Sequence, residues 1–266
     1  MPSAYLLVSH GSRDPRPQIA MEQLAKLIYQ QKSQVVDKEK LSLGASNSNK
    51  HTSTSNASTL ACLAEPLVET AYLELSPTPL HQQIVEFSDR ALAFGYNRIQ
   101  VVPLFLLAGV HVTEDIPAEV EQAKQIIGQK LLVELRSHLG TYAKLTDLLA
   151  SQMATTTTDA SILIAHGSRR PDAKVAVEKI ASRLGALAAY WAVPPKLAAR
   201  VQELVDIGHQ RIAVVPYFLF AGGITDAIAS TVEELNSQFP SAHLQLLEPI
   251  GASAQLANLI MDLVEE

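Results

Sequence analysis

The chain has 266 residues, about the length of two ordinary domains, with 47% hydrophobic residues and a net charge of -6. The negative charge argues against a general nucleic-acid-binding protein, because such proteins need a basic surface. Cys62 is the only cysteine, which excludes an intrachain disulfide or a thiolate metal cluster and fits a reducing cytoplasm. The N-terminal apolar run, residues 4–8, is too short for a signal-peptide core, and no apolar run approaches the length of a membrane-spanning helix. We therefore expect a soluble cytoplasmic protein with no membrane partner.

The first predicted elements are a buried strand and an amphipathic helix. Residues 5–8 form a short unbroken apolar run, typical of a strand covered on both faces in a parallel sheet. Beyond Pro15, apolar residues recur at helical spacing. Residues 32–60 then contain many Lys, Ser, Asn and Thr residues and few large apolar ones, which predicts a mobile insertion with His51 in solvent.

Strands and helices alternate along the rest of the chain. Residues 99–106 and 212–219 are long apolar runs typical of buried strands, and each is separated from the strand before it by sequence of helical period. The polar residues 155–159 read as a linker between two halves. This alternation predicts the α/β class, with a mostly parallel sheet flanked by helices in each half.

The two halves are copies of one unit. Residues 7–13 closely match residues 163–169, and residues 98–106 closely match residues 211–219. We therefore expect two tandem domains, residues 1–153 and 154–266, with a cleft between them.

The copies also locate the insertion. The offset between equivalent residues is 156 at His10 and His166 but 118 at Tyr72 and Tyr190, so the first copy contains 38 extra residues. The insertion at about residues 32–60 accounts for most of that difference.

The same turn sequence follows the first strand of each copy. His10 stands where the strand is expected to end, and the carboxyl ends of parallel strands form the ligand crevice of open α/β sheets. Gly11 permits a tight turn, and the next two residues lie near a helix N-terminus, where free N–H groups attract anions. We expect carboxylate or phosphate groups of a ligand to contact Ser12 and Arg13 in the turn of the first copy.

Two polar positions of the first copy are lost from the second. Ala192 replaces Glu74, and Ile224 or a one-residue gap stands opposite His111. A role in holding the fold together would require these side chains in both copies, so their loss points to function. Together with His10 they form a set of two imidazoles and one carboxylate, which suits Fe²⁺, Co²⁺, Ni²⁺ or Zn²⁺ better than Mg²⁺ or Ca²⁺.

Asp115 has two alternative roles in this interpretation. It lies four residues after His111, at a spacing that allows its carboxylate to orient the imidazole. Alternatively, Thr113 or Asp115 caps the next helix. The sequence leaves both alternatives open.

These motifs together resemble the class II chelatases that insert a divalent metal into sirohydrochlorin, in the long two-repeat form of the cobalt or iron enzyme. The resemblance spans nearly the whole chain and is carried by four segments: residues 10–13, 72–75, 102–106 and 111–117. It implies two chelatase-like domains, the second a degenerate repeat. It also implies that His10, Glu74 and His111 are the catalytic and metal-binding residues.

The resemblance further implies a mechanism and a ligand. Sirohydrochlorin is a flexible tetrapyrrole with eight carboxylates, and two pyrrolic protons leave as the metal enters. The resemblance implies that this ring lies in the cleft between the halves, with its carboxylates near Ser12, Arg13, Ser168 and Arg169. His10 or His111 would act as base and ligand, with Glu74 as ligand or proton acceptor. No organic cofactor is expected, since the chain has no nucleotide-binding glycine motif. The metal substrate is Co²⁺ or Fe²⁺, with Ni²⁺ also open, and the two copies predict a monomer with an internal pseudo-dimer.

Two other functions fit the sequence less well than a chelatase. A non-catalytic metal-trafficking or tetrapyrrole-binding protein would retain its metal tightly, whereas three protein ligands in an open cleft favour exchange. A histidine phosphatase also has a His-Gly pair after its first strand, but the arginine expected just before that histidine is Ser9 in one copy and Ala165 in the other.

Overall fold

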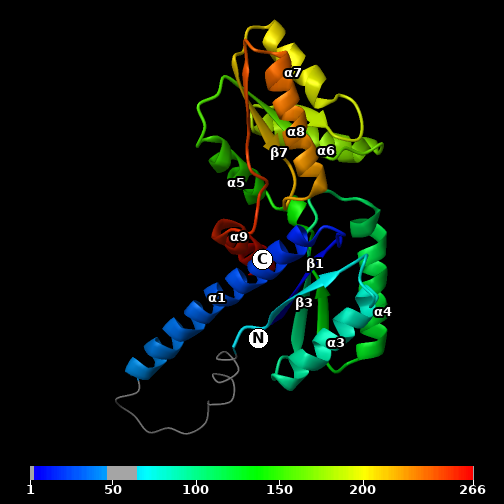
Figure 1. The fold of residues 1–266 in the computed structure, drawn as a ribbon. Coiled ribbons are helices and arrows are strands. Elements are labelled where there is room, and N and C mark those ends of the chain that lie inside the picture. The colour runs from blue at the N-terminus through cyan, green and yellow to red at the C-terminus, as the bar shows by residue number, and fades with distance from the viewer. Residues whose placement is uncertain (1–2, 47–64, 266) are drawn as a thin grey trace.

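Two four-stranded parallel sheets form the framework of the protein (Figure 1). A computed structural model describes residues 3–46 and 65–265, without side chains for residues 36–46. The first sheet has the order β2-β1-β3-β4, and its strands are β1 (Ala4–Ser9), β2 (Val68–Tyr72), β3 (Arg98–Pro103) and β4 (Leu132–Leu135). The second repeats that order as β6-β5-β7-β8, with β5 (Ala160–Ala165), β6 (Leu187–Tyr190), β7 (Arg211–Pro216) and β8 (His243–Leu246).

Helices connect the parallel strands in both halves, which confirms the predicted α/β class. Those before β5 are α1 (Pro15–Ser46), α3 (Leu80–Ala93), η2 (His111–Asp115), α4 (Ile116–Ile127), η3 (Leu139–Thr141) and α5 (Lys144–Met153). Those after β5 are α6 (Pro171–Arg183), α7 (Leu197–Asp206), α8 (Gly223–Gln238) and α9 (Ala254–Glu265). None of the helices in the described part of the chain has the length and apolarity needed to cross a membrane.

Helix α1 is longer than the sequence predicts. Residues 32–46, assigned above to a mobile insertion, continue the helix. Their Lys, Gln, Glu and Leu residues are good helix formers, so a polar composition does not exclude a helix here. Residues 47–64 lie outside the described residues. They include the remainder of the predicted insertion, with His51, and also Cys62.

The strands that lead to the site are shorter than their apolar runs. β3 ends at Pro103 and β7 at Pro216, each three residues before the predicted end, at 106 and 219. Proline has no N–H to offer the ladder, which disfavours extending regular pairing beyond this point. The apolar residues that follow β3 therefore belong to a loop that leads to η2 rather than to the strand.

The last helix of each half packs against the other half. α9, the last helix of the second copy, lies along α1 of the first (Figure 1), where Lys32 Nζ is 2.6 Å from a Glu265 carboxylate oxygen. α5, the last helix of the first copy, lies beside the second sheet, and its Asp147 is 4.0 Å from Arg183 in α6. One hydrophobic cluster consequently includes Leu24 of α1, residues of both terminal helices and Leu163 of β5. The division at residues 153 and 154 stays a prediction about the repeat units.

Candidate metal-binding site

His10 and Glu74 become neighbours because pairing between β1 and β2 continues past the ends of both strands. The Leu73 N–H donates to the Ser9 carbonyl and the Glu74 N–H donates to the His10 carbonyl, each over 2.9 Å. Gly11 follows with a φ of +94°, and a Cβ there would lie 2.1 Å from the Glu74 carbonyl oxygen. Only glycine therefore permits this close approach of the two chains.

A π-helical turn places His111 at the same end of the sheet as His10 and Glu74. The loop after β3 leads to Gly109, whose carbonyl accepts the N–H groups of Val112 and Thr113 over 3.0 Å. The Ile116 N–H donates to the His111 carbonyl, the i to i+5 pattern that defines the turn. Such turns are rare and occur frequently at functional sites.

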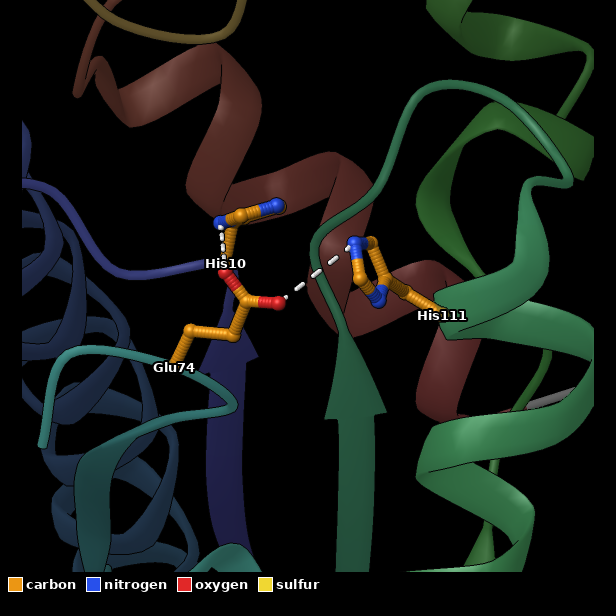
Figure 2. Close-up of side chains that lie close together, drawn as sticks. All are labelled: His10, Glu74 and His111. Atoms are coloured by element: carbon orange, nitrogen blue, oxygen red, sulfur yellow. Dashed lines mark ion pairs between the residues drawn. The ribbon is translucent and has the colours of Figure 1, made fainter.

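The three predicted ligands lie together (Figure 2). One Glu74 carboxylate oxygen is 3.7 Å from His10 Nδ1 and the other is 3.9 Å from His111 Nε2. Both distances are too long for hydrogen bonds, so the carboxylate lies between two imidazoles without bonding to either. Two atoms that ligate one ion at about 2.1 Å are at most about 4.2 Å apart. All ligand atoms lie within 4.8 Å of one another, so small side-chain rotations bring them onto a shared ion.

Asp115 orients His111 and does not cap a helix. Its Oδ2 lies 2.7 Å from His111 Nδ1, whereas no side-chain bond from Asp115 caps α4. The Thr113 hydroxyl donates back to the Gly109 carbonyl over 3.2 Å. Of the two alternatives left open by the sequence, the geometry selects the first. With Nδ1–H held by Asp115, Nε2 is the atom presented toward Glu74.

The imidazole rings also contact one another and an aromatic neighbour. His10 and His111 are arranged edge to face with centroids 4.7 Å apart, and Phe105 lies 6.4 Å from each. The side chains of His10, Glu74 and His111 are 51%, 49% and 33% exposed, so a ligand can reach all three. The apolar run 99–106 predicts a strand position for Phe105 and gives no signal for its contact with both histidines.

Two pockets adjoin the site from different sides. One, of about 370 Å³, lies between the start of α3 and the η2–α4 segment and is lined by Glu74, His111, Asp115 and other residues of the first half. The other, of about 250 Å³, contains His10 and Tyr72 of the first half together with Leu219 and Phe220 of the second. The second pocket therefore lies between the halves, as the predicted cleft requires.

The predicted substrate-binding residues are only partly gathered in this pocket. Ser12 lines it, whereas Arg13, Ser168 and Arg169 do not. Ser12 Oγ accepts the Asp14 N–H over 3.0 Å, and Ser168 Oγ accepts the Arg170 N–H over 3.1 Å. Both serines thus stabilise their own turns, a role in the fold that explains why both copies have them. Arg13 and Arg169 are exposed just beyond β1 and β5.

An ion-pair network that the sequence did not predict connects the halves near this pocket. Arg16 of α1 donates to both oxygens of Asp226 in α8, over 2.9 and 2.6 Å, and also pairs with Asp14 at 2.5 Å. The guanidinium lowers the pKa of Asp14 to about 2. Asp226 follows Arg16 by 210 residues, and no local pattern in the sequence indicates such a contact.

The second repeat has the same backbone hydrogen bonds at this point without the glutamate and the second histidine. The Trp191 N–H donates to Ala165 over 2.9 Å and the Ala192 N–H donates to His166 over 2.7 Å, as at the equivalent positions of the first copy. Among described residues, the trio of the first repeat is the one grouping of acidic, histidine or cysteine side chains close enough to share an ion.

Comparison with known proteins identifies the family. The model of the CbiX family matches residues 44–156 and again residues 160–266, one match for each repeat. The chain belongs to the CbiX family. This confirms the relationship that the sequence motifs indicate, and the double match confirms the duplication.

Named relatives of this CbiX-family chain are chelatases. A sirohydrochlorin cobaltochelatase of Priestia megaterium is 24% identical over 219 residues, covering 76% of this chain and 70% of the relative. A sirohydrochlorin ferrochelatase of the same organism is 25% identical over 185 residues, covering 65% of this chain and 68% of the relative. SirB of Bacillus subtilis, in a structure with Fe³⁺, has the same fold with a TM-score of 0.70 at 23% identity, covering 100% of this chain and 95% of SirB.

Proposed function

We propose that this protein inserts Co²⁺ or Fe²⁺ into sirohydrochlorin and that His10, Glu74 and His111 carry the reaction. The observation on which the proposal depends is the Glu74 carboxylate, which lies between two imidazoles at distances that leave room for an ion. The names of the curated relatives support the substrate. Transfer to a tetrapyrrole in siroheme or cobalamin synthesis, in the cytoplasm, is part of the same proposal.

The two pockets give the three side chains different tasks. His111 and Glu74 line the pocket on the α4 side, so we assign them to holding the incoming ion, with Asp115 fixing the His111 ring. His10 lines the pocket between the halves, where the tetrapyrrole would bind. An imidazole near neutral pH can take up a proton released from a pyrrole nitrogen, so His10 is the proposed base.

The pocket between the halves suits one face of a macrocycle. Tyr72, Leu219 and Phe220 offer aromatic and apolar surface, and Ser12 adds a polar group at the edge. Carboxylates at the periphery of the ring would reach Arg13 and Arg169, which are exposed just beyond the carboxyl ends of β1 and β5. Since one chain supplies both sides of the pocket, a monomer that acts as an internal pseudo-dimer of residues 1–153 and 154–266 is sufficient.

The absorbance of sirohydrochlorin tests this function directly. Adding Co²⁺, Fe²⁺ or Ni²⁺ in separate reactions, with and without enzyme, measures the rate of insertion for each ion. We expect strong acceleration over the uncatalysed reaction with Co²⁺ or Fe²⁺. Tight metal binding with no acceleration would favour the alternative, a metal-trafficking or tetrapyrrole-binding protein.

A further inference from the structure

Leu75, the residue after Glu74, has an unusual backbone conformation. Its φ is +57°, and among the residues that the structure describes it is the one non-glycine residue with positive φ. L-residues avoid this region because the side chain crowds the following carbonyl. The Leu75 side chain is 60% exposed, so burial of its apolar surface does not offset the strain. Strained backbone of this kind clusters at functional sites.

The equivalent segment of the second repeat lacks this strained backbone. Pairing is equivalent as far as Glu74 and Ala192, but the next residue, Val193, does not have positive φ. Its Cγ2 would lie 2.9 Å from a Cβ at Gly167, and it packs against the hydrophobic core. The Val193 side chain therefore lies over Gly167, the glycine that follows His166.

Leu75 does not pack over the glycine in this way, and the contact with Gly11 differs as a result. The atom that approaches Gly11 is the Glu74 carbonyl oxygen and not a side-chain carbon of residue 75. The peptide unit after Glu74 is therefore oriented differently from the one after Ala192.

We propose that the left-handed backbone at Leu75 is a positioning feature that holds the Glu74 carboxylate between His10 and His111. Leu75 acts through Glu74 and touches neither ion nor tetrapyrrole. This inference rests on the metal-binding role proposed above. It predicts that position 75 tolerates residues according to their ease of adopting positive φ and not according to their hydrophobicity.

Co²⁺ titration of the full chain without tetrapyrrole, followed by calorimetry, tests this order. Glycine adopts positive φ freely and asparagine tolerates it, so Leu75→Gly and Leu75→Asn should bind Co²⁺ within about threefold of the unmodified protein. A β-branched residue is strained there, so Leu75→Val should bind about tenfold more weakly. Because Leu75 is exposed, these substitutions remove no core packing, and thermal melting should confirm folded variants.

Two controls separate positioning from a general structural role. In a Glu74→Gln background, Leu75→Val should cause no further loss of Co²⁺ affinity, because the group through which it acts is gone. Val193→Asn, at the equivalent position of the second repeat, should lower the melting temperature and leave Co²⁺ affinity unchanged.

Three results would overturn the inference. Affinity that follows hydrophobicity, with Val equal to Leu and both Gly and Asn weak, would assign the effect to the apolar side chain. Equal affinity in all Leu75 variants, with Glu74→Gln weakened, would reject the role of Leu75 alone. Unchanged affinity in Glu74→Gln would reject the proposed metal site itself, and the role of Leu75 with it.

Discussion

The two repeats have one architecture and different chemistry. Both have a four-stranded parallel sheet in the same order and a His-Gly turn after the first strand, with the same backbone bonds to the neighbouring segment. Only the first places Glu74 and a second histidine beside that turn. The comparison teaches that the turn belongs to the fold, whereas the carboxylate, His111 and the left-handed Leu75 belong to the proposed site.

The largest expected difference between the repeats concerns their histidines. His111→Ala should lower the rate of metal insertion by at least about 100-fold, because it removes both a ligand and the edge-to-face partner of His10. His166→Ala should only raise the KM for sirohydrochlorin. Steady-state kinetics on both variants measure this contrast. Equal loss of kcat in the two would mean that the second repeat takes part in the chemistry.

The two glycine turns should also respond differently to alanine. Gly11→Ala would place Cβ 2.1 Å from the Glu74 carbonyl oxygen and must displace that segment, so Co²⁺ affinity should fall. A fall of more than about tenfold is expected when one ligand withdraws. Gly167→Ala would crowd Tyr190 and Val193 and should lower the melting temperature with unchanged Co²⁺ affinity. If Gly11→Ala bound Co²⁺ normally, the close approach would not matter for the site.

A smaller effect is expected at Asp115. Asp115→Asn keeps the size of the side chain but removes the charge that fixes Nδ1–H of His111, so metal affinity should fall about tenfold. Co²⁺ titration of this variant measures the loss, and Glu114→Gln, a neighbouring acid on the same turn, is the matched control. An identical response in the two variants would indicate a general charge effect in place of orientation.

The smallest effect is expected for the ion pairs between the halves. Arg16→Gln should lower the melting temperature slightly near neutral pH, since exposed pairs contribute little. The folded pKa of Asp14 is depressed from 3.8 to about 2, so its contribution is present above pH 3.8 and is lost as the pH falls through about 2. Melting curves of both proteins should therefore converge over that interval. A constant difference down to the lowest pH would assign the effect to packing of the Arg16 side chain.

Most of the fold and the grouping of His10, Glu74 and His111 were predictable because their signals can be read directly from the sequence. Apolar runs indicated the parallel strands, and the loss of Glu74 and His111 from the second copy singled them out. The network of Arg16 and Asp226 was not predictable, because it depends on how the halves approach one another. The φ of Leu75 was not predictable either, because leucine carries no signal for a left-handed turn.

The partners of the two terminal helices also escaped prediction, for a different reason. α5 and α9 follow equivalent strands and both are amphipathic, so the sequence pattern alone does not say which half each one covers. The choice is made by apolar contacts between segments far apart in the chain, in the cluster that both helices share with α1 and the second sheet. Lys32 with Glu265 and Lys144 with Asp262, each at 2.6 Å, add ion pairs at the surface of this packing.

The position of α9 along α1 has a consequence for protein synthesis. A ribosome releases the chain from its amino end, so all residues of the proposed metal site emerge long before residues 254–265. Until those residues emerge, the apolar side of α1 that α9 covers, with Leu24 and Ile28, lacks its partner. The half that holds the proposed metal ligands therefore completes its core only after translation of the other half.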